Sequence, residues 1–193
     1  MTLTHRGPDE EGYFINDKAF VGLGHQRLSI IDLATGQQPL SSEDGSVWIS
    51  FNGEIYNFQD LIQELEAKGH QLRTKSDTEA IVHAWEEWGP DAVKKLKGMF
   101  AFAIWDENKQ QLFLARDRLG KKTLYYLDEP KRFVFGSEIK AILLKGAASR
   151  QYLQTPMLEG VNGVGSQLIL SCTRSRSLVK GSPNGTLAAL EHP

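Results

Sequence analysis

The sequence lacks several features that would assign a protein to a class at once. None of its apolar runs approaches the roughly 20 residues of a membrane-spanning helix, so we expect no membrane partner. The first seven residues contain no apolar segment of the secretory-signal type, and a cytoplasmic location is expected. A single cysteine, Cys172, excludes a disulfide framework and a cysteine-rich metal site, which fits a reducing compartment.

An excess of basic charge is also missing. The 193 residues include 22 Lys and Arg against 24 Asp and Glu, a net charge of −2, so nothing in the charge favours a nucleic acid partner. The sequence has no zinc or iron–sulfur spacing and no glycine-rich phosphate loop after a strand. We therefore expect no metal and no cofactor in the domain that this chain forms.

The composition changes sharply near residue 146. Of the 18 aromatic residues 17 precede residue 147, as do 22 of the 24 acidic residues, and the last 47 residues contain no Phe, Trp or Asp. This break predicts one domain over residues 1–146 and an irregular tail over 147–193 that is not a domain. Within the tail, 164–170 is the only segment that we expect to form a strand.

The first region alternates strand-like and helix-like patterns. Bulky apolar runs separated by short turns predict strands over 47–51, 100–105, 111–116, 124–127 and 132–135. Helical spacing predicts helices over 58–69, 77–88, 91–96 and 138–143. Consecutive strands joined by short turns form antiparallel sheets, so the predicted fold class is α+β.

Five polar motifs follow the apolar runs, and each has an ordinary structural interpretation. The motifs are His5–Asp9, Gly24–Asp32, Asn52–Asn57, Ser76–Glu79 and Ala115–Gly120. Asn52-Gly53 is a common hairpin-turn dipeptide, and Asp77 is a plausible helix cap. Arg27 could pair structurally with Asp32 or Asp117. The charged residues of the first and last motifs are interpreted as scaffold braces with no catalytic role.

Taken together, the five motifs resemble the glutamine-hydrolysing domain of asparagine synthetases, a class II amidotransferase domain with an N-terminal nucleophile. The resemblance covers roughly residues 4–145, with the motifs in the family's order and spacing. It implies two packed antiparallel sheets flanked by helices, an αββα arrangement of the N-terminal-nucleophile hydrolase type. It also implies that L-glutamine is hydrolysed to glutamate and ammonia, and that the ammonia is used to make asparagine from aspartate.

The resemblance assigns a role to each matched residue. Arg27 would hold the glutamine α-carboxylate, because a guanidinium matches a carboxylate with two hydrogen bonds. Asp77 would hold the α-ammonium from the start of a helix, which stabilises a negative charge. Asn52 and Gly53 would form the oxyanion hole, and Glu54 would contact the substrate beside them. The backbone of four residues would line the same pocket: Leu28, Ser29, Ile30 and Ile31.

The match breaks at both ends. The family's nucleophile is an N-terminal cysteine that opens the first strand, and here only four residues precede His5. Nothing after Gly146 looks like the family's ATP- and magnesium-dependent synthetase domain. The resemblance also implies a homodimer for the full-length family. We therefore expect a truncated fragment that is inactive alone. The alternative is a non-catalytic module that binds glutamine or a protein partner.

Overall fold

The structure is a computed structural model that describes residues 10–16, 18, 21–27, 37–74, 76–129, 132–143, 168–173, 178–181 and 187–188. Its strands are β1 (Glu10–Asn16), β2 (Val21–Arg27), β3 (Leu40–Ser41), β4 (Val47–Ile55), β5 (Gly98–Asp106), β6 (Gln111–Arg116), β7 (Tyr125–Glu129), β8 (Arg132–Gly136), β9 (Leu168–Thr173), β10 (Leu178–Gly181) and β11 (Leu187–Ala188). Its helices are α1 (Phe58–Ala67), α2 (Asp77–Trp88), the 3₁₀ turn η2 (Gly89–Asp91), α3 (Ala92–Lys95) and α4 (Ile139–Leu143).

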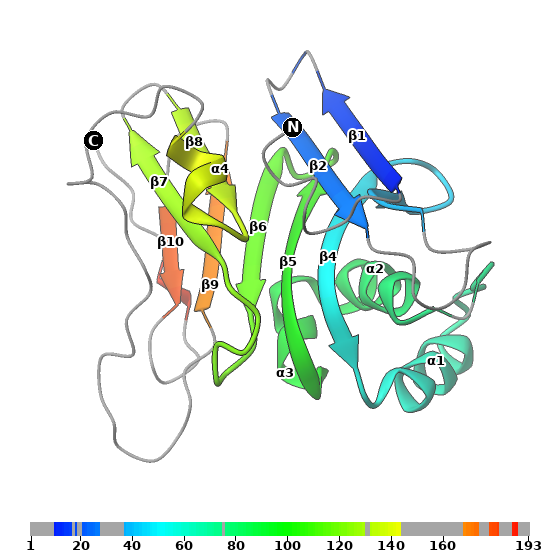
Figure 1. Ribbon diagram of the computed structural model, residues 1–193. Helices are drawn as coiled ribbons and strands as arrows, with labels where there is room; N and C mark the ends of the chain where they lie inside the picture. Colours follow the sequence, from blue (N-terminus) through cyan, green and yellow to red (C-terminus); the bar gives the residue numbers. More distant parts are fainter. Residues whose placement is uncertain are drawn as a thin grey trace.

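A central antiparallel sheet organises the fold (Figure 1). Its strand order is β11-β10-β9-β6-β5-β4-β3, and β4 and β5 pair along nine residues, from Val47 opposite Asp106 to Ile55 opposite Gly98. Two separate hairpins, β1-β2 and β7-β8, are also antiparallel. All pairings among the described strands are antiparallel, so the sheets agree with the predicted fold class.

One face of the central sheet is covered by helices. Side chains alternate between the faces of a strand, and Phe100, Phe102 and Ile104 of β5 all point to the same side. There they pack with Ile81 and Trp85 of α2, both buried. The apolar stripes predicted for α1 and α2 therefore bury against this face.

The opposite face is covered by the two hairpins. The alternate residues of β5, Ala101, Ala103 and Trp105, pack with Leu23 of β2 and Tyr126 of β7. Beyond the second hairpin, α4 packs Ile142 against Leu127 of β7. The layers are therefore helices α1–α3, the central sheet, the hairpin layer and α4, which confirms the predicted αββα arrangement (Figure 1).

Most predicted elements are present, with corrected ends. The strand predicted over 47–51 continues to Ile55, so the interpretation of Asn52-Gly53 as a hairpin turn is wrong. Asn57 precedes α1 but makes no capping bond; its side chain instead bonds to Lys95 O and Lys97 N, which ties α1 to α3. The prediction that 164–170 is the only strand of the tail is wrong, because the described residues there form β9, β10 and β11, and β9 pairs with β6. The division at residue 146 stays a prediction.

No helix in the part of the chain described here is long and apolar enough to cross a membrane.

Candidate functional site

The end of β4 approaches β5 unusually closely. Gly53 has a φ of +156°, and a Cβ there would lie 2.1 Å from Met99 O. A Cβ at Gly98 would likewise lie 2.1 Å from Glu54 O. Both positions need glycine, because any side chain would collide with backbone atoms of the facing strand.

Three backbone N–H groups of β4 point to the edge away from β5. Phe51 N donates to Gln38 Oε1 at 2.6 Å, and Ile55 N donates to Asp77 Oδ2 at 3.2 Å. Phe100 lies opposite Gly53 on β5. Its backbone N donates to Asp117 Oδ2 and its O accepts from Asp117 N, so both groups point to the β6 side and not to Gly53. Because antiparallel hydrogen bonding alternates along a strand, Gly53 N–H points the same way as its two neighbours. No described residue accepts a hydrogen bond from Gly53 N–H, so this backbone donor between Phe51 and Ile55 has no partner among the described residues.

Asp77 opens α2 beside this edge. Ser76, the N-cap, accepts a hydrogen bond from Glu79 N at 3.2 Å, as its sequence pattern predicts. Asp77 is half-buried, and burial raises the pKa of its carboxyl group. The negative charge of Glu54 adds to that rise, and hydrogen bonds from the backbone of Ile55 and Thr78 only partly offset it. The fold thus holds a carboxylate where its charge is disfavoured, which is common for binding groups.

Glu79 fixes the loop that leads into α2. In a capping box its side chain would return to Ser76 N, but the buried carboxylate instead accepts from Arg73 N at 2.8 Å and Thr74 N at 2.6 Å. It also accepts from Thr74 Oγ1 at 2.5 Å. Burial alone would raise the pKa of Glu79, but these hydrogen bonds and nearby His83 lower it below its usual value. Glu79 therefore positions the residues just before Asp77.

The remaining two predicted residues of β4 lie at the same end of the strand. Asn52 is half-buried and follows Trp48 and Ser50 on the face that the β1-β2 hairpin covers. Its amide makes no hydrogen bond to any residue that the structure describes. Glu54 is exposed and acts on Asp77 through its charge. The structure thus brings Asn52, Gly53, Glu54 and Asp77 to one edge of the sheet.

Arg27 is the last residue of β2, opposite Glu10. Two residues earlier in β2, His25 Nδ1 lies 3.2 Å from Ser50 Oγ, so this strand crosses over β4 close to Asn52. The other four predicted lining residues fall outside the described residues: Leu28, Ser29, Ile30 and Ile31.

Asp117 braces the turn after β6, as the sequence predicts. Its buried carboxylate accepts hydrogen bonds from the backbone N–H groups of Phe100, Leu119, Lys121 and Lys122 at 2.9–3.3 Å. Burial would raise the pKa of Asp117, but these four hydrogen bonds lower it below its usual value. The predicted braces His5, Arg6 and Asp9 lie outside the described residues.

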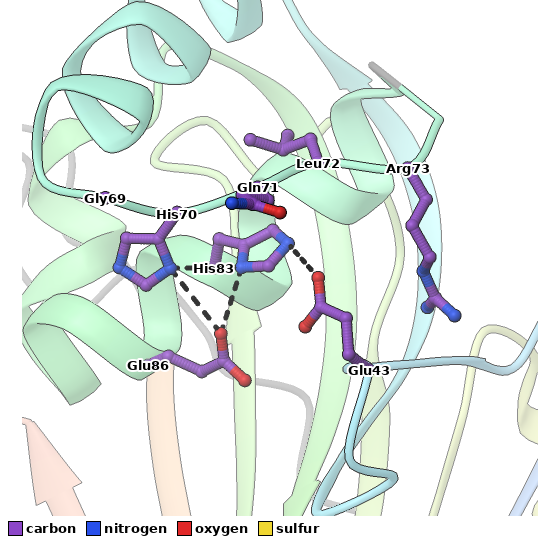
Figure 2. A pocket seen from close by; sticks show the side chains of 8 residues that line it. All are labelled: Glu43, Gly69, His70, Gln71, Leu72, Arg73, His83 and Glu86. Atoms are coloured by element: carbon purple, nitrogen blue, oxygen red, sulfur yellow. Dashed lines mark hydrogen bonds and ion pairs between the residues drawn. The ribbon is translucent and has the colours of Figure 1, made fainter.

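Sequence reasoning missed a second polar cluster on the far side of Glu79. His70, in the turn after α1, and His83, on α2, meet with Glu43 and Glu86 at a cavity of about 430 Å³ (Figure 2). Burial would lower the pKa of His83, but its hydrogen bond to Glu86 and the charges of Glu43, Glu86 and Glu79 raise it above its usual value. Only the spacing His83-x-x-Glu86 on a predicted helix could have indicated this cluster.

Comparison with known proteins identifies proteins of similar sequence. Residues 1–168 match the family described as "Glutamine amidotransferase domain". The chain is 49% identical over 142 residues to asparagine synthetase [glutamine-hydrolyzing] 1 of Bacillus subtilis, covering 74% of this chain and 22% of that protein. It is 41% identical over 145 residues to the amidase chry2 of Gibberella zeae, covering 75% of this chain and 22% of the amidase. The chain thus spans about a fifth of the length of these relatives.

A solved structure shares the fold. Glutamine phosphoribosylpyrophosphate amidotransferase from B. subtilis, complexed with ADP and GMP, superimposes with a TM-score of 0.67 over 96% of this chain and 45% of that chain. At 22% identity this likeness establishes the architecture alone. With the family match extending over most of its length, the chain belongs to the glutamine amidotransferase domain family.

Proposed function

We propose that this chain binds L-glutamine at the edge of β4 and forms the glutamine-hydrolysing part of an asparagine synthetase. The observation that carries the proposal is the carboxylate of Asp77, which is half-buried at the first position of α2 and 3.2 Å from Ile55 N. An α-ammonium group placed against it would remove the cost of keeping this charge partly buried. Arg27 would hold the α-carboxylate, with Leu28, Ser29, Ile30 and Ile31 lining the pocket between them.

The other end of the substrate is its carboxamide. Hydrolysis by this class of enzyme begins when a thiolate attacks the carboxamide carbon and its oxygen becomes negatively charged. Gly53 N–H points to the open edge of β4, and the Asn52 amide lies at the same end, so these two donors would stabilise the oxyanion. The amide nitrogen then takes the proton that the thiol lost, and the C–N bond breaks to leave a thioester and ammonia. Water finally releases glutamate from the thioester. We assign no nucleophile among the described residues.

The rest of the reaction belongs to a partner domain. In the proposed enzyme a second domain activates aspartate with ATP and magnesium, and the ammonia released here attacks the activated acid. The ligase reaction, asparagine biosynthesis, a cytoplasmic location and homodimer formation all belong to this proposal. Identity of 49% with an asparagine synthetase supports aspartate as the acceptor. The 41% identity with a fungal amidase supports a second candidate, in which the same glutamine site serves another acceptor.

Isothermal titration calorimetry with L-glutamine tests the binding step directly. We expect saturable binding of one L-glutamine per chain and much weaker binding of D-glutamine. Only one enantiomer can place its α-ammonium group at Asp77, its α-carboxylate at Arg27 and its carboxamide at Gly53 at the same time. Equal heats from both enantiomers, or none from L-glutamine, would contradict the proposal. In a chain supplied with the family's N-terminal cysteine strand and joined to a synthetase domain, transfer of the ammonia to an acid other than aspartate would favour the second candidate.

A further inference from the structure

His70, His83 and Glu86 converge on one point beside the cavity (Figure 2). His70 follows Gly69 in the turn after α1, while His83 and Glu86 lie one turn apart on α2. The three atoms that face one another are His70 Nδ1, His83 Nδ1 and Glu86 Oε2. Each of these atoms has a lone pair that it can donate to a metal ion. With neutral imidazoles, there are too few protons between the three atoms for every contact to be a good hydrogen bond.

The distances among these atoms match those around a bound zinc ion. His70 Nδ1 and His83 Nδ1 are 3.1 Å apart, His83 Nδ1 and Glu86 Oε2 are 3.0 Å apart, and His70 Nδ1 and Glu86 Oε2 are 3.8 Å apart. Tetrahedral ligands with bonds of about 2.0–2.1 Å are separated by about 3.3 Å. The observed distances lie on either side of that value, so small side-chain shifts would complete the geometry.

The other nitrogen of each imidazole faces a carboxylate. His83 Nε2 lies 3.3 Å from Glu43 Oε1 and 3.8 Å from Glu79 Oε1. His70 Nε2 lies 3.4 Å from Glu87 Oε2. A carboxylate at this position accepts a hydrogen bond from Nε2–H, which leaves the lone pair on Nδ1, and this is the usual arrangement behind metal-bound histidines. Both Nδ1 atoms of the cluster are thereby oriented as ligands.

The local charge also favours a cation. The carboxylates of Glu43, Glu79, Glu86 and Glu87 surround the two imidazoles. Among the described residues, two basic side chains pair with them: Lys68 with Glu87 at 2.7 Å and Arg73 with Glu79 at 3.7 Å. With neutral imidazoles this leaves two negative charges, which one divalent cation would balance.

We propose that His70, His83 and Glu86 bind a divalent cation of the zinc class through His70 Nδ1, His83 Nδ1 and a carboxylate oxygen of Glu86. Two imidazoles and one carboxylate are a known zinc ligand set, and the fourth position would be open to the cavity and occupied by water. The sequence predicted no metal, because one ligand lies in a turn and the other two lie on the next helix. Only the packing of α1 against α2 brings the three together.

Such an ion would join the turn after α1 to α2. Glu79, which contacts His83, also holds the backbone of Arg73 and Thr74 in the loop before Asp77. The cation would therefore stabilise the segment that leads to the proposed glutamine site without contacting the substrate. Asp77→Asn should accordingly leave zinc binding unchanged, so that failure of the metal proposal and failure of the glutamine proposal can be told apart.

Zinc titration against a colorimetric chelator tests the site in the metal-free chain. We expect one Zn²⁺ per chain, an affinity reduced more than about 100-fold by His70→Ala, and a reduction of about 10–100-fold for Glu87→Gln, which removes only the carboxylate behind His70. His25→Ala, which removes a histidine on β2, is the matched control and should bind as the wild type does. With Co²⁺, the wild type should show the intense visible absorption of a four-coordinate site.

Two results would overturn the proposal. One is the absence of saturation near one equivalent of zinc. The other is equal zinc affinity in His70→Ala and His25→Ala. If His70→Ala does not fold, Glu86→Gln, which preserves the side-chain shape, replaces it in the zinc titration. Its control is Glu64→Gln, which removes an exposed carboxylate paired with Lys95. A Glu86→Gln affinity equal to that of Glu64→Gln would contradict the ligand assignment.

Discussion

The replacement Asp77→Asn separates a binding role from a structural one. The pKa of Asp77 is raised in the folded chain, so the stability linked to this group is full below its unfolded value of about 3.9 and is lost as the pH rises through the folded value. At pH 7 the wild type therefore carries the free-energy cost of holding the charged Asp77 carboxylate half-buried, and Asp77→Asn does not. The amide oxygen can still accept the hydrogen bond that Ile55 N makes to Asp77 at 3.2 Å.

One effect opposes this gain in the stability of Asp77→Asn. A negative charge in the first turn of a helix is worth about 0.3–1 kcal/mol, and Asp77→Asn gives it up. The two effects have opposite signs, so we expect the free energy of unfolding to change by less than about 1 kcal/mol. Glutamine binding should change far more, because a hydrogen bond to a charged group contributes about 1.5–3 kcal/mol. That loss raises the dissociation constant about 10–150-fold.

Guanidinium unfolding and calorimetry with L-glutamine measure the two quantities. Asp60→Asn is the matched control, since Asp60 is the acidic residue in the first turn of α1 and is exposed. It should leave glutamine affinity unchanged. If Asp77→Asn loses more than about 2 kcal/mol of stability and keeps its glutamine affinity, Asp77 is only a helix-capping residue and the reasoning is refuted.

Three further predictions concern the scaffold. Gly53→Ala should lower the free energy of unfolding, measured by denaturant titration, by about 2–4 kcal/mol, because its Cβ would lie 2.1 Å from Met99 O. The control is Gly22→Ala, whose Cβ would meet only Phe14 O at 3.9 Å, and it should cost less than about 1 kcal/mol in the same titration. Asp117→Asn should cost about 2–4 kcal/mol, since an amide cannot accept all four backbone hydrogen bonds, and an unchanged urea midpoint would refute that role. The pKa values of Asp106 and Asp117 are lowered, so their stabilising effect is present above about pH 3.9 and is lost as the pH falls through the folded values; urea midpoints measured from pH 7 to pH 2 should fall steeply below about pH 4, and less steeply in Asp117→Asn.

Local patterns predicted the elements that form from nearby residues. The Ser76 cap, the stripe of α2 and the β5-β6 hairpin depend on spacing along the chain, and all are present. The sequence did not predict β1 or β2, because the glycines at 12, 22 and 24 interrupt their apolar alternation. The predicted end of β4 was also too early, because the close approach at Gly53 and Gly98 depends on the facing strand.

The candidate site shows the same limit. Its residue types were predicted from motifs, but the alignment of Gly53 N–H with Ile55 N and Asp77 depends on pairing with β5 and packing of α2. The cluster of His70, His83 and Glu86 depends on helix packing alone. Contacts between residues distant in sequence are not encoded in any local pattern, and these contacts decide which polar side chains meet.

The most direct test of the account is an NMR titration of the ¹⁵N-labelled chain with L-glutamine. The account predicts saturable shifts of the backbone amide signals of Gly53, Ile55 and Thr78, with weak or no shifts from D-glutamine. Saturating L-glutamine that leaves the signals of Gly53 and Ile55 unmoved, or D-glutamine that shifts them equally, would contradict the claim that this edge of β4 is a glutamine site.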